Sequence, residues 1–437
     1  MELKSYAYSV IGKEVSTISK YFDRVIHFSP IHESTIANWV EAKKSVTIPK
    51  GEEFKIKDIE GTNILFLDGN INHSSDVQSL LGGLKNQMNR SSRIVAVLYN
   101  PYLRWVFQLL NRLGLREGDL PETFISESSL KVLAQLSGFE ISRLQTVLFC
   151  PFRFFGLGAL INNILRAIPG IRHLGFASVV TLRPLLVENK KPSLTIVVPA
   201  RNEAGNISRV IPELKNLEDL SVEIIFVEGH SKDDTWEQIQ QEMRAYQGPF
   251  TLKAYQQTGK GKKNAVLEGF EKASGDLLTI LDADLTMPAE KIRLFYDTYT
   301  RGLGDFINGS RLVYPMADGS MQFLNHLGNI FFAKALSFVT DQSFTDSLCG
   351  TKLVSKKHYG FIREWCRDFG DFDPFGDFEL IFPASVLGLG SIDIPIRYQA
   401  RTYGETNISR FQHGWQLLRM TFIGLITIKM GRTLQRS

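Results

Sequence analysis

The chain has 437 residues, of which 43% are hydrophobic and 22% are charged. This length exceeds what one domain usually needs and the composition is that of an ordinary globular protein, so we expect two folded domains and no extensive disorder. The formal net charge of +4, from 50 basic and 46 acidic residues, argues against a nucleic-acid partner, which usually requires a concentrated basic face.

The compartment can be inferred from the cysteines and the apolar segments. Cys150, Cys349 and Cys366 are widely spaced and form no CxxC pair, so we expect free thiols in a reducing compartment. Residues 1–15 lack the continuous apolar core of a signal peptide, and no uncharged apolar stretch reaches the roughly 18 residues that a membrane-spanning helix needs. The sequence therefore predicts a cytoplasmic protein.

In the first part of the chain, two apolar segments flank a helical pattern. Residues 62–70 and 92–100 are expected to be buried strands, and residues 75–88 between them have the apolar spacing of a helix. A further helix is expected within 126–139, with a serine at its start and a glycine near its end. This pattern predicts part of an α/β layer.

Residues 60–185 resemble the C-terminal half of a class I methyltransferase, including its late sequence of a helix, a Gly-Phe pair and a strand. The methyl-donor pocket of that family needs a glycine-rich turn after a strand, because only glycine lets the backbone approach the cofactor closely. Before Gly61, only Gly12 and Gly51 occur, and there is no GxGxG sequence. We therefore expect a smaller, degenerate methyltransferase-like α/β domain over residues 1–187.

Residues 184–193 have the composition of a domain boundary, with two prolines and three charged residues between two strand-like segments. We expect a second domain over residues 192–437. Its strands alternate with helices, which predicts a mostly parallel sheet whose strand ends meet at one edge, where the ligands of open α/β sheets bind. The expected strands are 193–202, 222–231 and 276–284, and the expected helices are 233–247 and 262–274.

Two aspartates end the third of these strands, in the sequence Asp-Ala-Asp. Residues two apart in an extended chain face the same way, so Asp282 and Asp284 are expected to project together into the crevice at the sheet edge. Neighbouring carboxylates repel unless a cation lies between them, and Mg²⁺ or Mn²⁺ completed by phosphate oxygens would satisfy both. Pro288 is expected to open the next helix. The alternative for the aspartates is a solvated turn.

Acidic residues also end the two preceding strands. Glu203 and Glu228 could face the same crevice and accept hydrogen bonds from a base or a ribose. The alternative for each is a carboxylate that caps the following helix. For Asp233, capping is the interpretation we favour.

Glycines flank lysines in the segment TGKGKKNAVLEGF, residues 258–270. Backbone N–H groups at a helix start, together with Lys260 or Lys262, could contact a nucleotide or its phosphates. The alternative is a solvated basic turn. The GxxxxGK[ST] spacing of a Walker loop is absent, so ATP hydrolysis is not predicted.

Taken together and in this order, the segments between about residues 192 and 430 resemble the family 2 glycosyltransferases, in particular the dolichyl-phosphate mannose synthase-like branch. The matching sequences are PARNE (199–203), VEGHSKDDT (227–235), DAD (282–284), Arg311 in GSR, Asp346 and Gly350 in DSLCGTK, and Arg401 in RTYGETN. The resemblance implies a nucleotide-diphospho-sugar transferase (GT-A, Rossmann-like) fold and an enzyme that uses Mg²⁺ or Mn²⁺.

The resemblance also implies roles for single residues. The residues expected at the nucleotide-sugar site, with the lysine inferred above, are Pro199, Ala200, Glu203, Glu228, Lys260 and Asp282. Asp284 would ligate the metal, and Asp282 would hold the ribose or a metal-bound water. Arg311 and Arg401 would face phosphate groups of the donor or acceptor, which a guanidinium matches bidentately; surface ion pairs are the alternative.

The sequence departs from the family pattern at three positions. Asn407 stands where the synthases usually carry lysine, Thr286 where glutamine commonly follows DAD, and Gly229 where a second aspartate is common. Without the lysine, one positive charge that would face a phosphate is missing. The residues expected for binding the sugar-nucleotide donor are therefore more completely present than those expected for a polyprenyl-phosphate acceptor. The expected acceptor is a polyprenyl phosphate or a glycan of the cell surface.

The expected reaction is a single displacement at the anomeric carbon, with a metal-neutralised nucleoside diphosphate leaving from the opposite face, which inverts the configuration. A phosphate acceptor is already ionised, whereas a hydroxyl acceptor needs a carboxylate to take its proton. Within residues 372–384, Asp377 and Glu379 are the candidates for this catalytic base, and capping of a helix is the alternative. His413 is expected to be a helix-start or interface residue.

Two apolar segments interrupted by arginine or lysine, residues 152–176 and 415–432, have a pattern that can lie on a bilayer surface without crossing it. The alternative is a buried helix with a solvated basic edge. The expected location is accordingly either the cytoplasm at large or, as a peripheral protein, the inner face of the plasma membrane.

Two other functions compete with sugar transfer. One is an S-adenosylmethionine-dependent methyltransferase with a sugar-nucleotide-binding accessory domain, and the other is a non-catalytic sugar-nucleotide-binding scaffold. The joint presence of Asp282, Asp284, Arg311 and Arg401 favours an inverting, metal-dependent glycosyltransferase.

Overall fold

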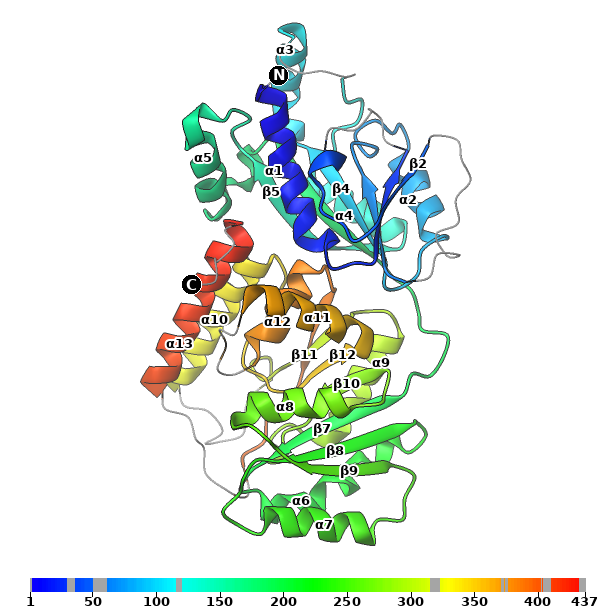
Figure 1. Ribbon diagram of the computed structural model, residues 1–437, viewed down its shortest axis with the longest axis vertical. Helices are drawn as coiled ribbons and strands as arrows, with labels where there is room; N and C mark the ends of the chain where they lie inside the picture. Colours follow the sequence, from blue (N-terminus) through cyan, green and yellow to red (C-terminus); the bar gives the residue numbers. More distant parts are fainter. Residues whose placement is uncertain are drawn as a thin grey trace.

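The computed structural model places two α/β domains one after the other along the long axis of the molecule (Figure 1). The segment between the last strand of the first domain and the first strand of the second contains the expected boundary between residues 187 and 192. The structure describes residues 2–29, 36–49, 61–114, 120–314, 323–370, 373, 376–401, 403 and 410–431.

The first domain is built on a six-stranded sheet with the order β2-β1-β3-β4-β6-β5. The first four strands are parallel to one another, and β6 is antiparallel to both of its neighbours, β4 and β5. The strands are β1 (Arg24–Phe28), β2 (Ser45–Ile48), β3 (Asn63–Leu67), β4 (Arg93–Tyr99), β5 (Phe139–Leu148) and β6 (Ala177–Pro184). The expected strands over 62–70 and 92–100 are β3 and β4, and β3 is buried throughout.

Helices cover both faces of this sheet. One face packs on α1 through Val15 and Ile18, and the other packs on α2 and α4 through Leu81 and Leu130. The helix α4 begins where expected, because the Ser126 hydroxyl accepts a hydrogen bond from a backbone N–H of its first turn. The helices of this domain are α1 (Glu2–Ser19), α2 (Val77–Lys85), α3 (Arg104–Arg112), α4 (Glu127–Leu136) and α5 (Leu157–Arg166).

The second domain is built on a seven-stranded sheet with the order β13-β11-β12-β10-β7-β8-β9. Only β12 is antiparallel to its neighbours among the strands described. The strands are β7 (Leu194–Ala200), β8 (Val222–Glu228), β9 (Thr251–Gln256), β10 (Leu277–Ile280), β11 (Phe306–Ser310), β12 (Lys352–Ser355) and β13 (Ser391–Pro395). The three expected strands are β7, β8 and β10, which lie side by side at the centre.

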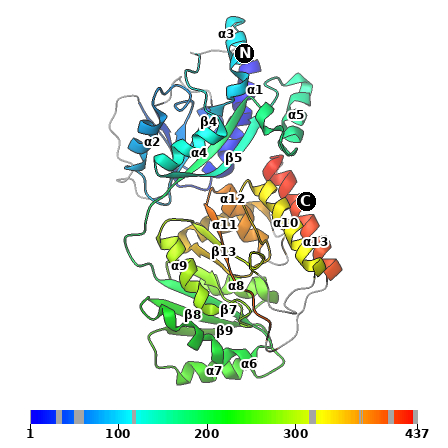
Figure 2. The same cartoon turned by 180° about the vertical axis from the view of Figure 1, so that it is seen from behind.

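The helices of the second domain divide between the two faces of its sheet. On one face, α6, α7 and α9 pack in one apolar core, and on the other face α8, α11 and α12 pack in another. A second view, from behind, shows α10 and α13 together along one side of this domain (Figure 2). The helices are α6 (Ala204–Val210), α7 (Thr235–Ala245), α8 (Gly261–Lys272), α9 (Ile292–Thr300), α10 (Phe323–Thr340), α11 (Lys356–Phe369), α12 (Phe378–Val386) and α13 (Arg410–Gly424). Pro288 directly precedes the single 3-10 turn that leads into α9.

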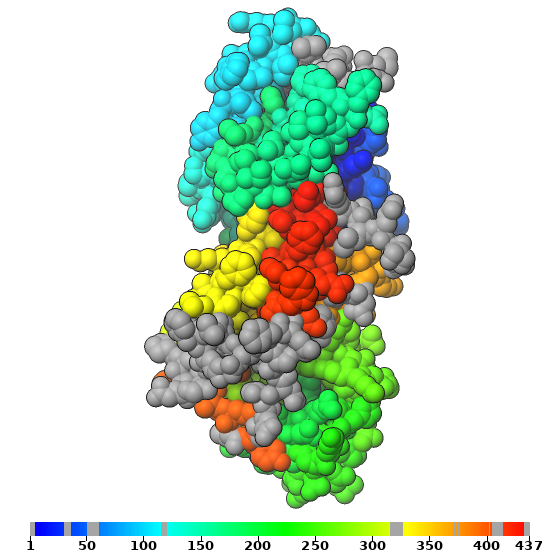
Figure 3. Space-filling view, turned by 90° about the vertical axis from the view of Figure 1, so that its left-hand side faces the viewer, coloured from blue at the N-terminus to red at the C-terminus, as the bar shows by residue number. Residues whose placement is uncertain are grey.

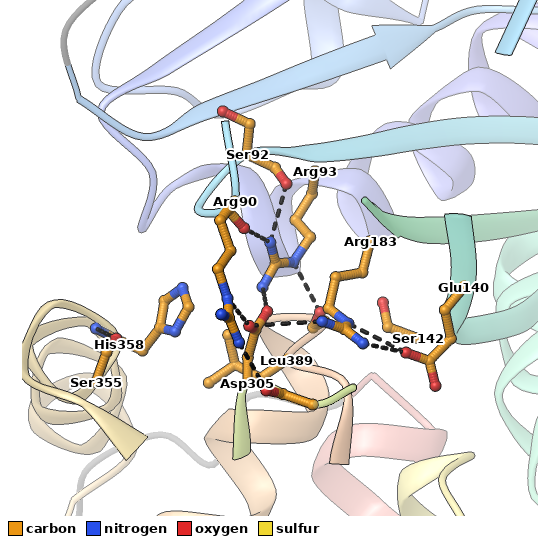
Figure 4. A network of polar contacts seen from close by, with 12 residues as sticks. Arg90, Ser92, Arg93, Glu140, Ser142, Arg183, Asp305, Ser355, His358 and Leu389 are labelled. Atoms are coloured by element: carbon orange, nitrogen blue, oxygen red, sulfur yellow. Dashed lines mark hydrogen bonds and ion pairs between the residues drawn. The ribbon is translucent and has the colours of Figure 1, made fainter. Parts of the chain in front are cut away.

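Three arginines of the first domain converge on one aspartate of the second (Figure 4). Arg90 Nε and Arg93 Nη2 lie 2.9 and 2.7 Å from the two carboxylate oxygens of Asp305, and Arg183 Nη1 lies 3.5 Å from Oδ1. Burial works to raise the pKa of Asp305, but Arg183 and Arg93 outweigh it and hold this pKa well below its ordinary value. The two domains are therefore joined through a buried ionic cluster.

His358 of α11 lies beside this cluster (Figure 4). Its ring is buried, and neither ring nitrogen has a hydrogen-bond partner in the described part of the chain. Burial lowers the pKa of His358 to about 3, although Asp305 acts in the opposite direction. The ring is therefore neutral in the folded protein at any physiological pH.

Among the residues that the structure describes, no helix combines the length and the apolar character that crossing a membrane requires.

Candidate active site

The carboxyl ends of β7, β8 and β10 open on one cavity of about 630 Å³ at the edge of the second sheet. Its walls carry both acidic and basic side chains. The lining residues are Pro199, Ala200, Arg201, Asn202, Glu203, Val227, Gly229, Gln257, Gly261, Lys262, Ala265, Asp282, Ala283, Asp284 and Arg401. A cavity at this position is where the topology of an open α/β sheet places a ligand.

The two aspartates after β10 lie together in this cavity, as the sequence predicts. The strand is anchored by four buried apolar or hydroxyl side chains, and the N–H of Leu281 continues the pairing by donating to the carbonyl oxygen of Val197 at 3.0 Å. Asp284 also holds the following turn, because its Oδ1 accepts hydrogen bonds from the N–H and the hydroxyl of Thr286, at 3.1 and 2.8 Å. The buried strand thus fixes where the two carboxylates are presented.

Each of these carboxylates is paired with a cation. Lys262 Nζ lies 2.5 Å from Asp282 Oδ1, and Arg401 Nη2 lies 2.5 Å from Asp284 Oδ2. Arg401 also reaches Glu203, with Nη1 at 3.4 Å from Oε1. Lys262 and Arg401 thus supply positive charge beside the two aspartates, which relieves the repulsion between these neighbouring carboxylates.

Gly350 makes the close approach of Lys262 and Asp282 possible. A Cβ atom at this position would lie 2.4 Å from Lys262 Nζ and 2.6 Å from Asp282 Oδ2, which is inside van der Waals contact. Any larger residue must push the lysine or the carboxylate away. The close contact between Lys262 and Asp282 therefore leaves no space for a side chain at position 350, the glycine of the DSLCGTK sequence.

Glu203 and Glu228 have different surroundings. Glu203 lines the cavity, is 7% exposed, and accepts a hydrogen bond from Asn206 Nδ2 at 2.7 Å. Burial raises the pKa of Glu203, against the effects of Asn206 and Arg401. Glu228 is 2% exposed, is not among the lining residues, and its Oε1 accepts from the N–H of Ser231 at 2.5 Å. Glu228 therefore holds the turn after β8 and does not cap the following helix α7, whose N-cap position is Asp234.

Of the two lysines that the sequence offers for the site, Lys262 lines the cavity and Lys260, the one assigned to the nucleotide-sugar site, does not. Lys260 occupies the N-cap position of α8 and is not among the residues that line the cavity, whereas Lys262 is. Gly261, with φ of +85°, turns the chain between them. Lys263 points elsewhere, with Nζ at 2.6 Å from Glu379 Oε1. The cation that faces Asp282 is therefore the second lysine of the segment.

Arg311 is held by Asp346 in a bidentate pair. Its Nε and Nη2 lie 2.6 and 2.9 Å from the two carboxylate oxygens, and its backbone N–H donates to Oδ2 at 3.0 Å. Burial works to raise the pKa of Asp346, but Arg311 outweighs it and lowers that pKa. Arg311 is 13% exposed and does not line the cavity, so this pair fixes the loop after β11 beside the site.

The two candidate bases lie in a second, smaller cavity of about 30 Å³, which shares Lys262 with the first. Asp377 is ion-paired with Lys352, and Glu379 with Lys263. Asp377 occupies the N-cap position of α12, but its carboxylate makes no capping hydrogen bond to that helix.

The cap of α12 comes instead from Asp373, whose Oδ2 accepts hydrogen bonds from the N–H groups of Phe378 and Glu379, at 2.7 and 3.2 Å. Asp377 therefore keeps its carboxylate for Lys352, and 18% of its side chain is exposed. Asp233 does have the capping role expected for it, because it accepts from the N–H groups of Ala204 and Thr235.

Two expected residues fall outside this description, and one further residue joins the site. The side chain of His413 and the whole of Asn407 lie outside the described residues. Lys352, in contrast, is a site residue that the sequence does not single out. Its side chain is 1% exposed. The only sequence signal for it is its position as the first residue of the strand β12, directly before two apolar residues.

A metal ion would depend on few protein ligands. Among the described residues there is no group of three or more His, Cys, Asp or Glu side chains suited to holding a metal. Asp282 and Asp284 still fit a hard divalent cation that takes its remaining oxygen ligands from a diphosphate and water. These two carboxylates alone would leave most coordination positions of such an ion to oxygen ligands from outside the protein.

Comparison with known proteins assigns the second domain. Residues 195–361 match the sequence profile of glycosyl transferase family 2. The low-salt glycan biosynthesis hexosyltransferase Agl6 of Haloferax volcanii is 30% identical over 234 residues, which cover 53% of this chain and 54% of that protein. The dolichol-phosphate mannosyltransferase of Pyrococcus furiosus is 34% identical over 223 residues, which cover 49% of this chain and 59% of that protein.

The chain thus spans somewhat more than half the length of these relatives. Among solved structures, the glucosyl-3-phosphoglycerate synthase of Mycobacterium tuberculosis in complex with Mn²⁺, uridine diphosphate and glucosyl-3-phosphoglycerate aligns at 16% identity with a TM-score of 0.38, over 54% of this chain and 81% of that one. Over residues 195–361, which are less than half of the chain, the second domain is therefore similar to the family 2 glycosyltransferases, and it follows a first α/β domain.

Proposed function

We propose that this chain is an inverting, metal-dependent glycosyltransferase that moves a sugar from a nucleoside diphosphate to the phosphate of a polyprenyl lipid. The observation that carries the proposal is the cavity in which Asp282, Asp284, Glu203 and Arg401 meet at the carboxyl edge of the second sheet. The alternative acceptor is a hydroxyl group of a glycan.

The donor side is supported by the chemistry of the cavity. Asp284, with Asp282, would hold Mg²⁺ or Mn²⁺, and the bound ion would neutralise the charge of the departing diphosphate. Arg401 contacts Asp284 through Nη2 and could exchange this carboxylate for a phosphate group, which a guanidinium can bind bidentately. Glu203 and the backbone of Pro199 and Ala200 line the part of the cavity at the end of β7, where the nucleoside is proposed to lie.

The acceptor side is supported by the positive charges around the second cavity. Lys262, Lys263 and Lys352 converge there on the carboxylates of Asp282, Asp377 and Glu379. Lys262 lines both cavities and could exchange Asp282 for an acceptor phosphate, which would need no base because it is already ionised. Two curated relatives bear names that state lipid-phosphate chemistry, the dolichol-phosphate mannosyltransferase above and the undecaprenyl-phosphate 4-deoxy-4-formamido-L-arabinose transferase of Proteus mirabilis, which is 24% identical over 220 residues.

If the acceptor is a hydroxyl instead, Asp377 is the better candidate for the base. Its side chain is 18% exposed against 7% for Glu379, and it borders the cavity that Lys262 shares with the donor side. Replacing Asp377 by asparagine separates the two acceptors. Transfer to a phosphate should survive the change, whereas transfer to a hydroxyl should be lost.

For the first domain we propose a methyltransferase-like scaffold without methyl-transfer activity. The proposal is supported by the antiparallel strand β6 between β4 and β5 and by the absence of a GxGxG sequence. Calorimetry of the full chain with S-adenosylmethionine tests it, and we expect no binding. Tight binding would restore the methyltransferase as the function of this domain.

The experiment that tests the main proposal is a panel of UDP- and GDP-sugars in a thermal-shift assay, with Mn²⁺ and with a chelator. A sugar nucleotide that binds the folded state raises the melting temperature by mass action. We expect one donor class to do so only with the metal, and the same donor to be consumed when a polyprenyl phosphate is added. Failure of every donor to bind would contradict the proposal.

A further inference from the structure

Three helices leave apolar stripes exposed. In α5 the exposed residues are Leu157, Leu160, Ile164 and, just beyond its end, Ile168; in α10 they are Leu327 and Phe331; in α13 they are Trp415, Leu418 and Phe422. Each set follows the three- and four-residue spacing of one helical face, while the opposite faces are buried in the protein. Trp415 is 70% exposed and Phe422 59%, which is unusual for side chains of this size.

The turn before α5 adds two exposed phenylalanines. Phe154 and Phe155 have φ angles of 39° and 52°, in the left-handed region that aromatic residues seldom adopt. Phe155 is fully exposed to solvent, and Phe154 is 57% exposed. Backbone strain that presents an aromatic side chain outwards is more often a sign of function than of stability.

These helices come from both domains and lie next to one another. Figure 3 shows α5 directly above α13, with α10 beside α13, on one face of the molecule. The carbonyl oxygen of Lys429, just beyond α13, accepts a hydrogen bond from Gln145 of β5, which fixes the end of the α13 segment to the first domain. We call the exposed sides of α5, α10 and α13, with Phe154 and Phe155, the apolar face.

The charges on the apolar face are of one sign. Residues 141–187, 319–340 and 406–437 contain no aspartate or glutamate, although these two residue types make up 46 of the 437 residues of the chain. The exposed cations on the face are Arg153, Lys334 and Arg419, and no ion pair is found for them within the described part of the chain. An apolar surface whose own described helices carry only positively charged exposed side chains complements an anionic lipid surface.

We propose that the apolar face docks this protein on a membrane that contains anionic phospholipids. The aromatic and aliphatic side chains of α5, α10 and α13 enter the boundary between headgroups and acyl chains, and the arginines and lysine extend along the surface to the lipid phosphates. A protein partner or a second copy of this chain fits less well, because protein surfaces present acidic and basic residues together and this face offers only basic ones.

The placement of the face suits a lipid substrate. α13 follows Arg401, one of the residues that line the donor cavity, in the chain. A polyprenyl chain held in the membrane could extend its phosphate from this face to the site. The proposal that the apolar face binds a membrane is independent of the proposed lipid-phosphate acceptor, because vesicle binding can be measured without a sugar donor and without catalysis.

The test is co-sedimentation of the full chain with vesicles of phosphatidylcholine alone and with vesicles that also contain phosphatidylglycerol. The natural sequence should bind the anionic vesicles and bind the neutral ones much more weakly. Replacing Phe155, Trp415 and Phe422 together by serine should weaken binding to anionic vesicles by about tenfold or more. Replacing Arg153, Lys334 and Arg419 together by glutamine should remove the preference for anionic vesicles.

The matched controls are Leu136→Ser in α4 and Leu294→Ser in α9, which remove exposed apolar side chains, 64% and 45% exposed, from other helices. Both should bind vesicles like the natural sequence. The melting temperature and the metal-dependent nucleotide binding of every variant should stay unchanged, which separates this proposal from the proposed catalysis.

Absence of vesicle binding by the natural sequence would overturn the proposal, as would equal binding by the serine variant and its controls. A dimer of the natural sequence in solution that the serine variant dissociates would also overturn it, in favour of a second copy on this face.

Discussion

The two sheets of this protein use the polar residues at their strand ends differently. At the carboxyl edge of the second sheet, Asp282, Asp284 and Glu203 line an open cavity and are met by cations from other elements. At the corresponding edge of the first sheet, Asn70 and Asn72 hydrogen-bond to backbone atoms of neighbouring strands. The polar residues at the strand ends thus form a candidate site in one α/β domain and stabilise the sheet through hydrogen bonds in the other.

The difference shows why function has to be argued from the site. Asp68 also ends a buried strand, and burial raises its pKa to about 6. A single carboxylate without converging cations offers neither a metal ligand pair nor a phosphate site. The second domain has the pair, the cations and the space for a ligand in one place.

The largest expected effect comes from the metal ligand. Asp284→Asn should lower the kcat/KM of sugar transfer by about 10³-fold or more, because it removes the group that we propose to hold the charge-neutralising ion at the leaving diphosphate. Asp68→Asn, the matched change at the first sheet, should leave transfer unaltered. Initial-rate assays with saturating Mn²⁺ measure both. An equal loss of kcat/KM in the two variants would contradict the conclusion that only the second sheet carries the site.

The next effect concerns the buried cluster between the domains. Asp305→Asn leaves three arginines without their carboxylate and should destabilise the protein by about 3–5 kcal/mol, as measured by urea unfolding. Asp368→Asn removes a carboxylate that also joins the two domains, to Lys20 and Tyr21, but at an exposed position. That change should cost no more than about 1 kcal/mol. Similar losses in both variants would show that burial of the cluster is unimportant.

Gly350→Ala tests the close packing at the edge of the site. The added methyl group would displace Lys262 or Asp282, so kcat/KM should fall by about 10- to 100-fold, in line with a displacement of about 1 Å at a reacting site. Gly360→Ala in α11 is the control, because nothing lies within 4 Å of the position that its added Cβ would take. In a helix this control should stabilise the protein by about 0.5–1 kcal/mol and leave turnover unchanged. Unaltered turnover in Gly350→Ala would show that the site tolerates the displaced side chain.

The smallest effect is a pH dependence of stability. The pKa of His358 is about 3 in the folded protein, against 6.5 for an ordinary histidine. Between these values the unfolded chain binds a proton that the folded one excludes, so stability is full above pH 6.5 and falls as the pH drops. The slope should approach about 1.4 kcal/mol per pH unit, and His358→Leu should remove it in urea unfolding series. An unchanged slope in that variant would assign the acid sensitivity to other groups.

Much of the site-bearing sheet could be predicted from the sequence. Continuous apolar runs indicated β7, β8 and β10. Asp282 and Asp284 both line the cavity as expected, but the reason given was wrong, because the strand ends at Ile280 and the aspartates follow it in a turn instead of in extended chain. These features depend only on local pattern and on the common direction of parallel strands.

The features that could not be predicted depend on contacts between residues far apart in the sequence, or on the direction in which each side chain points in the first turn of a helix. The sequence offered both Lys260 and Lys262, and only Lys262 lines the cavity, because Gly261 turns the chain at the first residue of α8. The pairing of Asp377 with Lys352 needs two elements to meet, and Arg93 and Asp305 lie 212 positions apart in the sequence. Fully buried arginines are rare, so composition gives no signal for such a cluster.

The central claim is that a divalent cation on Asp282 and Asp284 binds a nucleoside diphosphate to the second sheet. Isothermal titration calorimetry of UDP and GDP, each with Mn²⁺ and with chelator, tests this most directly on the natural sequence and on the Asp282→Asn, Asp284→Asn double variant. We expect one nucleotide to bind the natural sequence only when Mn²⁺ is present and not to bind the variant. Metal-independent binding of equal strength to both proteins would contradict the claim.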